Sequence, residues 1–138
     1  RFMGRDYVTL KRTDVGGTER WVENSVTTMN LKSSIVRVME SSGQYRVQGF
    51  VLNDGTPLEN VEVKIDDGPW ESANMSSRNT KYSWKLFSYN WQDPSPGEHT
   101  LISRATDING NVQATSDELP EKVSFWEDFA QFPRRVRI

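Results

Sequence analysis

The sequence contains no cysteine among its 138 residues. This absence excludes disulfides, cysteine-ligated zinc, iron–sulfur clusters and a thiol nucleophile. Long hydrophobic runs are missing as well: the longest apolar stretch is the three residues Phe50-Val51-Leu52, whereas a membrane-spanning helix needs about 20. Neither sign of charge is in excess, since 17 basic and 19 acidic residues leave a net charge of −2. Nucleic-acid-binding proteins usually carry a clear basic excess, so we do not expect nucleic acid as a partner. Because no long hydrophobic run is present, we do not expect a membrane as a partner either.

Histidine is nearly absent too, and His99 is the only one. An acyl-transfer triad needs a histidine base with a nucleophile and an orienting acid, and a usual zinc site needs several histidine or cysteine ligands. His99 follows Pro96-Gly97 at the start of a predicted strand, and we interpret it as a surface or turn residue. The carboxylate pairs Asp66-Asp67 and Glu127-Asp128 are adjacent in sequence, so on a strand their side chains face opposite ways. The sequence therefore predicts no self-contained active site.

The segment Asp107-Ile108-Asn109-Gly110-Asn111 places oxygen-bearing side chains at alternate positions, with Glu118 twelfth from Asp107. This spacing is similar to that of an EF-hand calcium loop. That loop requires glycine at its sixth position, where this chain has Val112. We therefore predict an Asn-Gly hairpin turn of type I′, in which Gly110 needs a positive φ angle, and no tightly bound calcium.

Aromatic residues are plentiful, with five Trp, four Tyr and six Phe. This apolar area indicates a folded chain, and the length is that of one common domain. The chain begins at Arg1 without an initiator methionine, so we expect a piece of a longer polypeptide. Residues 1–32 show no sustained apolar period and are predicted to be a lead-in or interdomain segment, whereas residues 33–138 are predicted to be the folded domain.

Apolar and polar residues alternate through most of residues 33–138. In residues 60–65, valine and isoleucine alternate with Glu62 and Lys64, which predicts a half-buried strand. Turn signals such as Asn53-Asp54-Gly55 and Asp67-Gly68-Pro69 separate the runs at intervals near the ~8–12 residues of an all-β sandwich or barrel. We predict an all-β fold, an immunoglobulin-like antiparallel β-sandwich of about seven strands. The expected strands are 34–39, 44–52, 60–66, 81–88, 98–106, 111–115 and 122–126, with 134–138 as a last edge strand.

The tryptophans are the unusual part of the composition. Trp84 alternates with Tyr82 and Leu86, which predicts a core position for its ring. Trp70 and Trp91 lie near turn signals, and exposed rings of this kind can form a carbohydrate- or protein-binding platform.

The C-terminal run Arg134-Arg135-Val136-Arg137-Ile138 is basic. Alternation places Arg135 and Arg137 on one polar face, with Val136 and Ile138 buried on the other. No aromatic platform accompanies it, as recognition of single-stranded nucleic acid would require. We predict a solvated or partner-facing strand.

Two segments together resemble one protein family. Val61-Glu62-Val63-Lys64-Ile65-Asp66-Asp67-Gly68-Pro69-Trp70 is similar to the V-E-V-x-x-D-x-G-x-W segment of the dimerisation domain of sulfite oxidase-type molybdopterin oxidoreductases. Ser103-Arg104-Ala105-Thr106-Asp107-Ile108-Asn109-Gly110-Asn111-Val112-Gln113 is similar to its R-A-x-D-x-x-x-N-x-Q segment. The first residues, Arg1-Phe2-Met3-Gly4-Arg5-Asp6-Tyr7-Val8, resemble the end of the preceding cofactor domain in bacterial members. The residues that carry the likeness are Asp66, Gly68, Trp70, Trp84, Arg104, Asp107, Asn111 and Gln113.

The resemblance implies an immunoglobulin-like domain that follows a molybdopterin-binding domain and helps the enzyme to form dimers. The family's molybdenum-ligating cysteine belongs to the upstream domain. This fragment is thus expected to be non-catalytic and to hold no cofactor, within a parent that is a molybdenum-cofactor oxidoreductase. A periplasmic location is implied by the likeness alone. Animal and plant members end in a W-N-x-R-G…W-H-R-V stretch whose arginine lies at the anion pocket. Here Asp128-Phe129 stand near that position, so the parent's substrate stays open.

The expected partners are a second copy of the chain and the upstream cofactor domain. The last part of the sequence has the aromatic and arginine content of an interface. Its interface candidates are Trp126, Phe129, Phe132 and Arg135. The alternative interpretation is an immunoglobulin-like module that binds carbohydrate or protein through Trp70 and Trp91.

Overall fold

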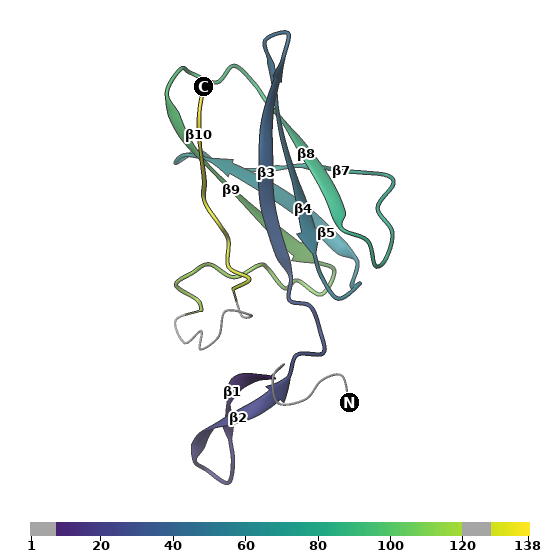
Figure 1. Cartoon of the computed structure of the whole chain (residues 1–138), viewed down its shortest axis with the longest axis vertical. Coiled ribbons are helices and arrows are strands. Elements are labelled where there is room, and N and C mark those ends of the chain that lie inside the picture. The colour runs from purple at the N-terminus through teal and green to yellow at the C-terminus, as the bar shows by residue number, and fades with distance from the viewer. Residues whose placement is uncertain (1–7, 120–127) are drawn as a thin grey trace.

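The computed structural model describes residues 8–119 and 128–138, so Trp126 and the strand predicted at 122–126 lie outside the described residues. Strands joined by turns and irregular segments make up these two ranges. Within them there is no helix with the length and apolarity needed to cross a membrane. A two-stranded hairpin precedes two four-stranded antiparallel sheets that pack face to face (Figure 1).

The two sheets form an immunoglobulin-like sandwich. One sheet has the order β3-β4-β8-β7, and the other has the order β10-β9-β5-β6. In the immunoglobulin nomenclature these are the A-B-E-D and G-F-C-C′ sheets. The predicted all-β sandwich is therefore confirmed. The strands of the first sheet are β3 (Lys32–Ser41), β4 (Gln44–Leu52), β7 (Asn74–Met75) and β8 (Lys85–Trp91), and those of the second are β5 (Leu58–Ile65), β6 (Trp70–Ser72), β9 (Glu98–Asp107) and β10 (Arg134–Arg137).

The core lies between the sheets and is built by alternate residues of the long strands. On β5, Val61 and Val63 are fully buried while Glu62 and Lys64 face outward, as the alternation predicted. Burying each such side chain contributes about 1.5–3 kcal/mol relative to its exposure. The core consists of Ile35, Val47, Val51, Val61, Val63, Phe87, Trp91, Leu101 and Ala105.

The predicted burial of Trp84 is wrong, because the segment before β8 faces the opposite way. Trp84 is 61% exposed, whereas Lys85 and Phe87 point inward. The Lys85 Nζ donates hydrogen bonds to the carbonyl oxygens of Lys81 (2.6 Å) and Ser83 (3.0 Å), and also to that of Thr80. The aliphatic stem of Lys85 can therefore occupy a core position while its charged end is satisfied by the preceding loop.

Gly110 adopts a positive φ of 82°, as predicted, but its turn is not of type I′. Type I′ requires a positive φ at both central residues, and Asn109 does not have one. The Gly110 N–H donates instead to the carbonyl of Asp107 at 2.9 Å, with glycine at the end of the turn. The strand predicted at 111–115 is also wrong, since among the described residues it contributes only one isolated bridge, between Thr106 and Val112.

The described part of the predicted lead-in segment contains a β-hairpin, formed by β1 (Val8–Asp14) and β2 (Glu19–Ser25). It extends from one end of the sandwich (Figure 1). Every residue of β2 is exposed, so this strand has no buried face to impose an apolar alternation on its sequence.

Candidate functional site

The two family-like segments lie on neighbouring strands of one sheet. β5 and β9 pair antiparallel, which places Glu62 opposite Arg104. The Arg104 Nε donates to a carboxylate oxygen of Glu62 at 2.7 Å, and the guanidinium lies 4.2 Å from the ring centroid of Trp70 on β6. A cation–π contact at such a partly exposed site contributes about 0.5–1 kcal/mol. The structure thus brings Trp70 and Arg104 together.

A second cluster joins the end of β5 to the start of β9. Asp66 has a positive φ of 50°, and one of its carboxylate oxygens accepts the Thr100 N–H at 2.7 Å. The other accepts from the His99 Nδ1 at 2.7 Å, while the His99 Nε2 lies 2.8 Å from the carbonyl oxygen of Ser95. The predicted turn signal Asp67-Gly68-Pro69 lies here, but Asp66 rather than Gly68 has the left-handed conformation.

Both partners of the His99 ring are acceptors, so the two bonds require both ring nitrogens to donate. The side chain is only 10% exposed and meets the Trp91 ring edge-on, with 4.9 Å between the centroids. The bond to Asp66, followed by the bond to the Ser95 carbonyl, raises the pKa of His99. The Thr100 N–H, followed by His99, lowers the pKa of Asp66. This arrangement is an ion pair that holds a loop and leaves no ring nitrogen for base catalysis.

The Asp107 carboxylate closes its own turn. One oxygen accepts the backbone N–H groups of Asn109 (2.9 Å) and Asn111 (3.0 Å), and the other accepts the Asn111 side-chain amide at 2.9 Å. The side-chain bond from Asn111 is the main cause that lowers the pKa of Asp107. Asp107 and Asn111 therefore have a structural function in the turn. Within the described ranges, no three His, Asp or Glu side chains are grouped so that they could hold a metal ion.

Gln113 is 2% exposed and connects three segments of the chain. Its side-chain oxygen accepts the N–H of Ser33 at 2.9 Å and the Ser33 hydroxyl at 2.6 Å. Its amide nitrogen donates to the carbonyl oxygens of Ser33 (3.3 Å) and Phe129 (3.1 Å). The Ser33 hydroxyl also contacts that of Ser103 on β9 at 2.9 Å. Gln113 thus ties β3 to the C-terminal segment across the core.

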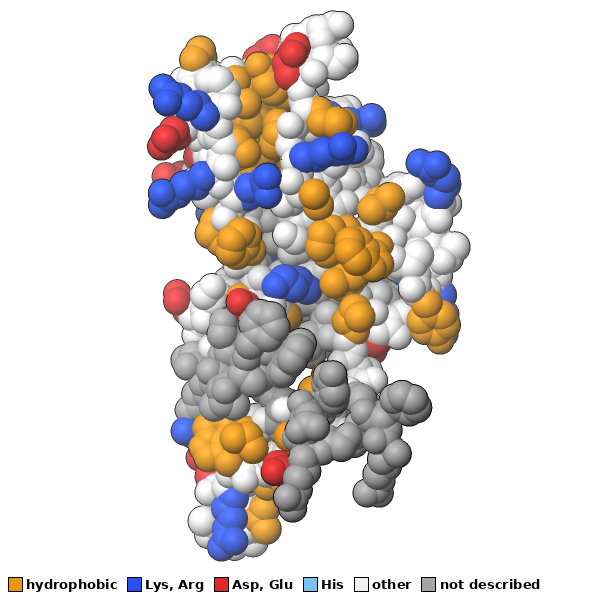
Figure 2. Space-filling model, in the orientation of Figure 1, with side chains coloured by type: hydrophobic (Ala, Val, Ile, Leu, Met, Phe, Trp, Pro, Cys, Tyr) orange, Lys and Arg blue, Asp and Glu red, His pale blue; other side chains and the backbone are white. Residues whose placement is uncertain are grey.

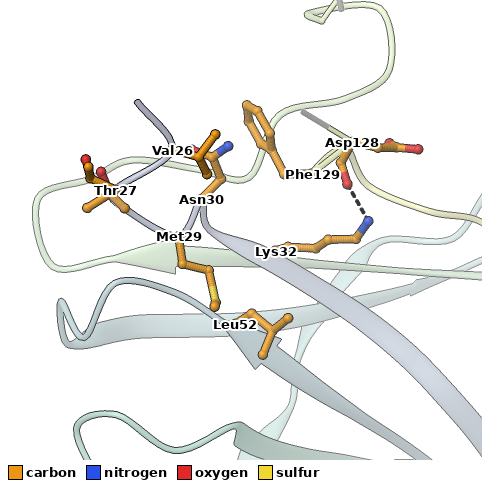
Figure 3. A pocket seen from close by; sticks show the side chains of 9 residues that line it. Val26, Thr27, Met29, Asn30, Lys32, Leu52, Asp128 and Phe129 are labelled. Atoms are coloured by element: carbon orange, nitrogen blue, oxygen red, sulfur yellow. Dashed lines mark hydrogen bonds between the residues drawn. The ribbon is translucent and has the colours of Figure 1, made fainter. Parts of the chain in front are cut away.

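A pocket of about 370 Å³ lies where the segment after the hairpin meets the sandwich (Figure 3). Met29, Leu52 and Phe129 give it a largely apolar lining. The Lys32 Nζ donates to the backbone carbonyl of Asp128 at 2.5 Å. The pocket brings no nucleophile and base together, so its geometry supports packing against an apolar group rather than catalysis.

The outer face of the β3-β4-β8-β7 sheet carries an apolar patch formed by Phe50, Trp84 and Leu86. The Phe50 and Trp84 rings lie 4.7 Å apart, and Leu86 is the cross-strand neighbour of Phe50. Figure 2 shows hydrophobic side chains gathered on this face over β4 and β8. The periodicity of the sequence assigned Trp84 to the core, so it did not reveal this patch.

The expected interface candidates have different environments. Phe132 is 61% exposed, and Arg135 is exposed on β10, an edge strand. Phe129 is half-buried in the pocket. Trp91, a member of the alternative platform, is 7% exposed and belongs to the core, so that expectation is wrong.

The fold is similar to that of a solved oxidoreductase. The crystal structure of the sulfane dehydrogenase SoxCD from Paracoccus pantotrophus matches with a TM-score of 0.68 and 23% sequence identity. The match covers 95% of this chain and 34% of the SoxCD chain, so this chain spans about a third of the length of that neighbour. No protein-family model matches the sequence, and no curated protein matches it either.

Proposed function

We propose that this chain is a non-catalytic assembly domain of a sulfite oxidase-like, molybdopterin-dependent oxidoreductase. The observation that carries the proposal is the convergence of the two family-like segments: Arg104 on β9 contacts both Glu62 on β5 and Trp70 on β6. The fold likeness to a sulfane dehydrogenase, over nearly the whole of this chain, is independent support.

A non-catalytic function agrees with the chemistry of the described residues. Both nitrogens of His99 and both carboxylate oxygens of Asp107 are engaged in structural bonds. The chain has no cysteine to ligate molybdenum. The cofactor in the proposed parent is therefore held by another part of the polypeptide, and a periplasmic location follows from the family likeness alone.

The proposed partners are a second copy of the chain and the cofactor domain of the same polypeptide. Two exposed apolar surfaces support this proposal, one at Phe132 and one at Phe50, Trp84 and Leu86. Interfaces are enriched in aromatic residues, and both surfaces expose them.

The coding sequence upstream of Arg1 tests the assignment directly. We expect a cofactor domain with a molybdenum-ligating cysteine to precede Arg1 in the same reading frame. A parent without such a domain would contradict the assignment. Light scattering of that parent, with and without residues 33–138, then tests assembly: the deletion is expected to convert a dimer into a monomer while molybdopterin remains bound. A dimer that survives the deletion would contradict the assembly function.

A binding module is the second candidate. Its aromatic platform consists of Tyr82 (80% exposed) and Trp84 (61% exposed) in place of Trp70 and Trp91. Exposed aromatic rings stack on sugar faces and serve as protein-binding anchors. Titration of the chain with soluble oligosaccharides, followed by tryptophan fluorescence, distinguishes the two. Saturable binding that is lost in Trp84→Ala would support the module.

A further inference from the structure

One flank of the sandwich has two open strand edges. β3 ends one sheet and β10 ends the other, and the two strands run along the same flank (Figure 1). A groove lies between them, with an apolar lining from Val38, Tyr45, Val136 and Ile138. The same side chains pack against the core while remaining partly exposed.

The outer edge of β10 has unpaired backbone groups. Ile138 and Gly97 exchange two backbone hydrogen bonds, of 2.9 and 3.1 Å. In an antiparallel ladder such pairs recur at every second residue, so Val136 bonds to His99 across the same ladder. The N–H and C=O groups of Arg135 and Arg137 consequently point away from β9, toward the free edge. An exposed edge of this kind is a template for an added strand.

This edge is also strongly basic in a chain whose net charge is −2. Arg134, Arg135 and Arg137 are exposed, and none of them forms an ion pair with another described residue. Arg37 adds a further positive charge to the groove from β3. The carboxylate of Glu40, also in the groove, already accepts the Gly43 N–H at 2.7 Å.

We propose that this groove binds an extended segment of a partner protein in which acidic and apolar residues alternate. The segment adds a strand to the free edge of β10, where its backbone pairs with Arg135 and Arg137. Side chains of an added strand alternate between the two faces. Its apolar residues therefore face the groove beside Val136, and its acidic residues lie beside the guanidinium groups.

A second copy of the chain does not fit this edge. Two-fold antiparallel pairing of β10 with its copy would place the arginines of one strand opposite those of the other. Like charges directly opposite in a ladder are destabilising. An acidic partner reverses the sign of that interaction, and electrostatic complementarity of this kind speeds association and selects the partner.

The test uses a fluorescein-labelled synthetic peptide of alternating glutamate and valine, titrated with the chain and followed by fluorescence anisotropy. Saturable binding is expected, and it weakens as salt is added. A peptide of alternating lysine and valine should bind at least about tenfold more weakly. The double variant Arg135→Glu/Arg137→Glu should weaken binding of the glutamate peptide by a similar factor. The control Arg46→Glu/Arg78→Glu, with exposed arginines outside the groove, should leave it unchanged.

Two variants of equal charge test the backbone pairing. Arg135→Pro removes an outward N–H that Arg135→Gln retains, so the proline variant should bind more weakly than the glutamine variant. Thermal melting establishes that each variant is folded. Three results would overturn the proposal: no saturable binding by the folded chain, equal binding of the lysine peptide, or binding that is unaffected by the double glutamate variant. A chain dimer that this variant dissociates would assign the edge to a second copy and overturn it as well.

Discussion

Gly110 has a φ of 82°, a conformation that residues with a Cβ rarely adopt. A Cβ added there would meet nothing within 4 Å, so the cost of substitution lies in the backbone alone. Gly110→Val is expected to lower the free energy of unfolding by about 1–3 kcal/mol, the range for a strained backbone. Urea unfolding followed by circular dichroism measures this change.

Gly110→Asn is the matched control, because asparagine tolerates the left-handed region better than valine does. It should cost distinctly less than valine at the same position. Equal stability of the valine variant and the unmodified chain would show that the turn does not need this conformation.

Trp91, at the end of β8, and Trp84, just before β8, lie in different environments. Trp91 is 7% exposed in the core, whereas Trp84 is 61% exposed outside it. Trp91→Ala is expected to destabilise the fold by about 3–5 kcal/mol through lost burial and a cavity. Trp84→Ser should cost distinctly less, about 0.5–1.5 kcal/mol, because it loses only the contact with the Phe50 ring. Thermal and urea unfolding of both variants test the orientation of this segment, and the reverse order of the two effects would contradict it.

At the scale of the element, Gln113 anchors the first strand of the sandwich. Its side chain supplies partners to the N–H, hydroxyl and carbonyl of Ser33, all of them buried. Gln113→Leu leaves the N–H and the carbonyl of Ser33 without these partners, each at a cost of about 1–3 kcal/mol, whereas the hydroxyl keeps its contact with Ser103. The change is expected to destabilise the fold by about 2 kcal/mol or more. Hydrogen exchange at the Ser33 amide should accelerate accordingly.

Gln92→Leu is the control for this change, because Gln92 is exposed on a loop. A surface substitution of this kind should stay within about 0.5 kcal/mol. If both variants lost the same stability, the Gln113 network would not be the cause.

The pairing of Asp66 with His99 makes stability depend on pH. The pKa of His99 is raised above 6.5. The stability that protonated His99 contributes to the fold is therefore complete below pH 6.5 and is lost as pH rises through the higher, folded-state pKa. The pKa of Asp66 is lowered below 3.8, so its contribution is complete above that pH and is lost as pH falls through the folded-state value. Both contributions are therefore present between pH 3.8 and pH 6.5.

Because His99 is the only histidine, His99→Gln isolates its titration. The unmodified chain should lose thermal stability as pH rises from 6 to 8, as expected for a histidine held in its charged form. The variant should lack this loss. Melting temperatures measured across the range test this, and parallel curves for the two proteins would assign the dependence to other groups.

At the scale of the whole molecule, the exposed aromatic surfaces predict self-association. A stable two-fold contact buries about 1,200–2,000 Å² in total. Phe132 or the Trp84 patch would therefore form the centre of the interface, and neighbouring surface residues would complete it. Light scattering coupled to size exclusion is expected to show a dimer rather than a 15.9 kDa monomer. Phe132→Asp and Trp84→Asp are tested separately, and the variant at the interface should dissociate the dimer.

Phe132 is the better choice for this test than Phe129. Phe129 is half-buried in the pocket of Figure 3, so replacing it would also disturb packing. A dimer that persists in both aspartate variants would place the contact elsewhere, and a monomer at high concentration would contradict autonomous pairing.

The alternation of residues 60–65 was sufficient to predict a strand and its buried face, because Val61 and Val63 are flanked by Glu62 and Lys64. The same reasoning failed around Trp84, where apolar residues occupy the outward positions and Lys85 occupies an inward one. In a strand, either of the two alternating sets of side chains can face the core. The packing of the opposite sheet determines which set is buried.

In the candidate site, too, some features were predictable from the sequence and others were not. The sequence by itself determined the all-β class, most strand positions, the positive φ at Gly110 and the residues that carry the family likeness. The tertiary structure alone decided that Arg104 contacts Trp70, that both nitrogens of His99 are engaged, and that Gln113 bonds to a strand 80 residues away. These contacts join segments far apart in the chain, and their geometry depends on how the two sheets pack. Local periodicity contains no information about that packing.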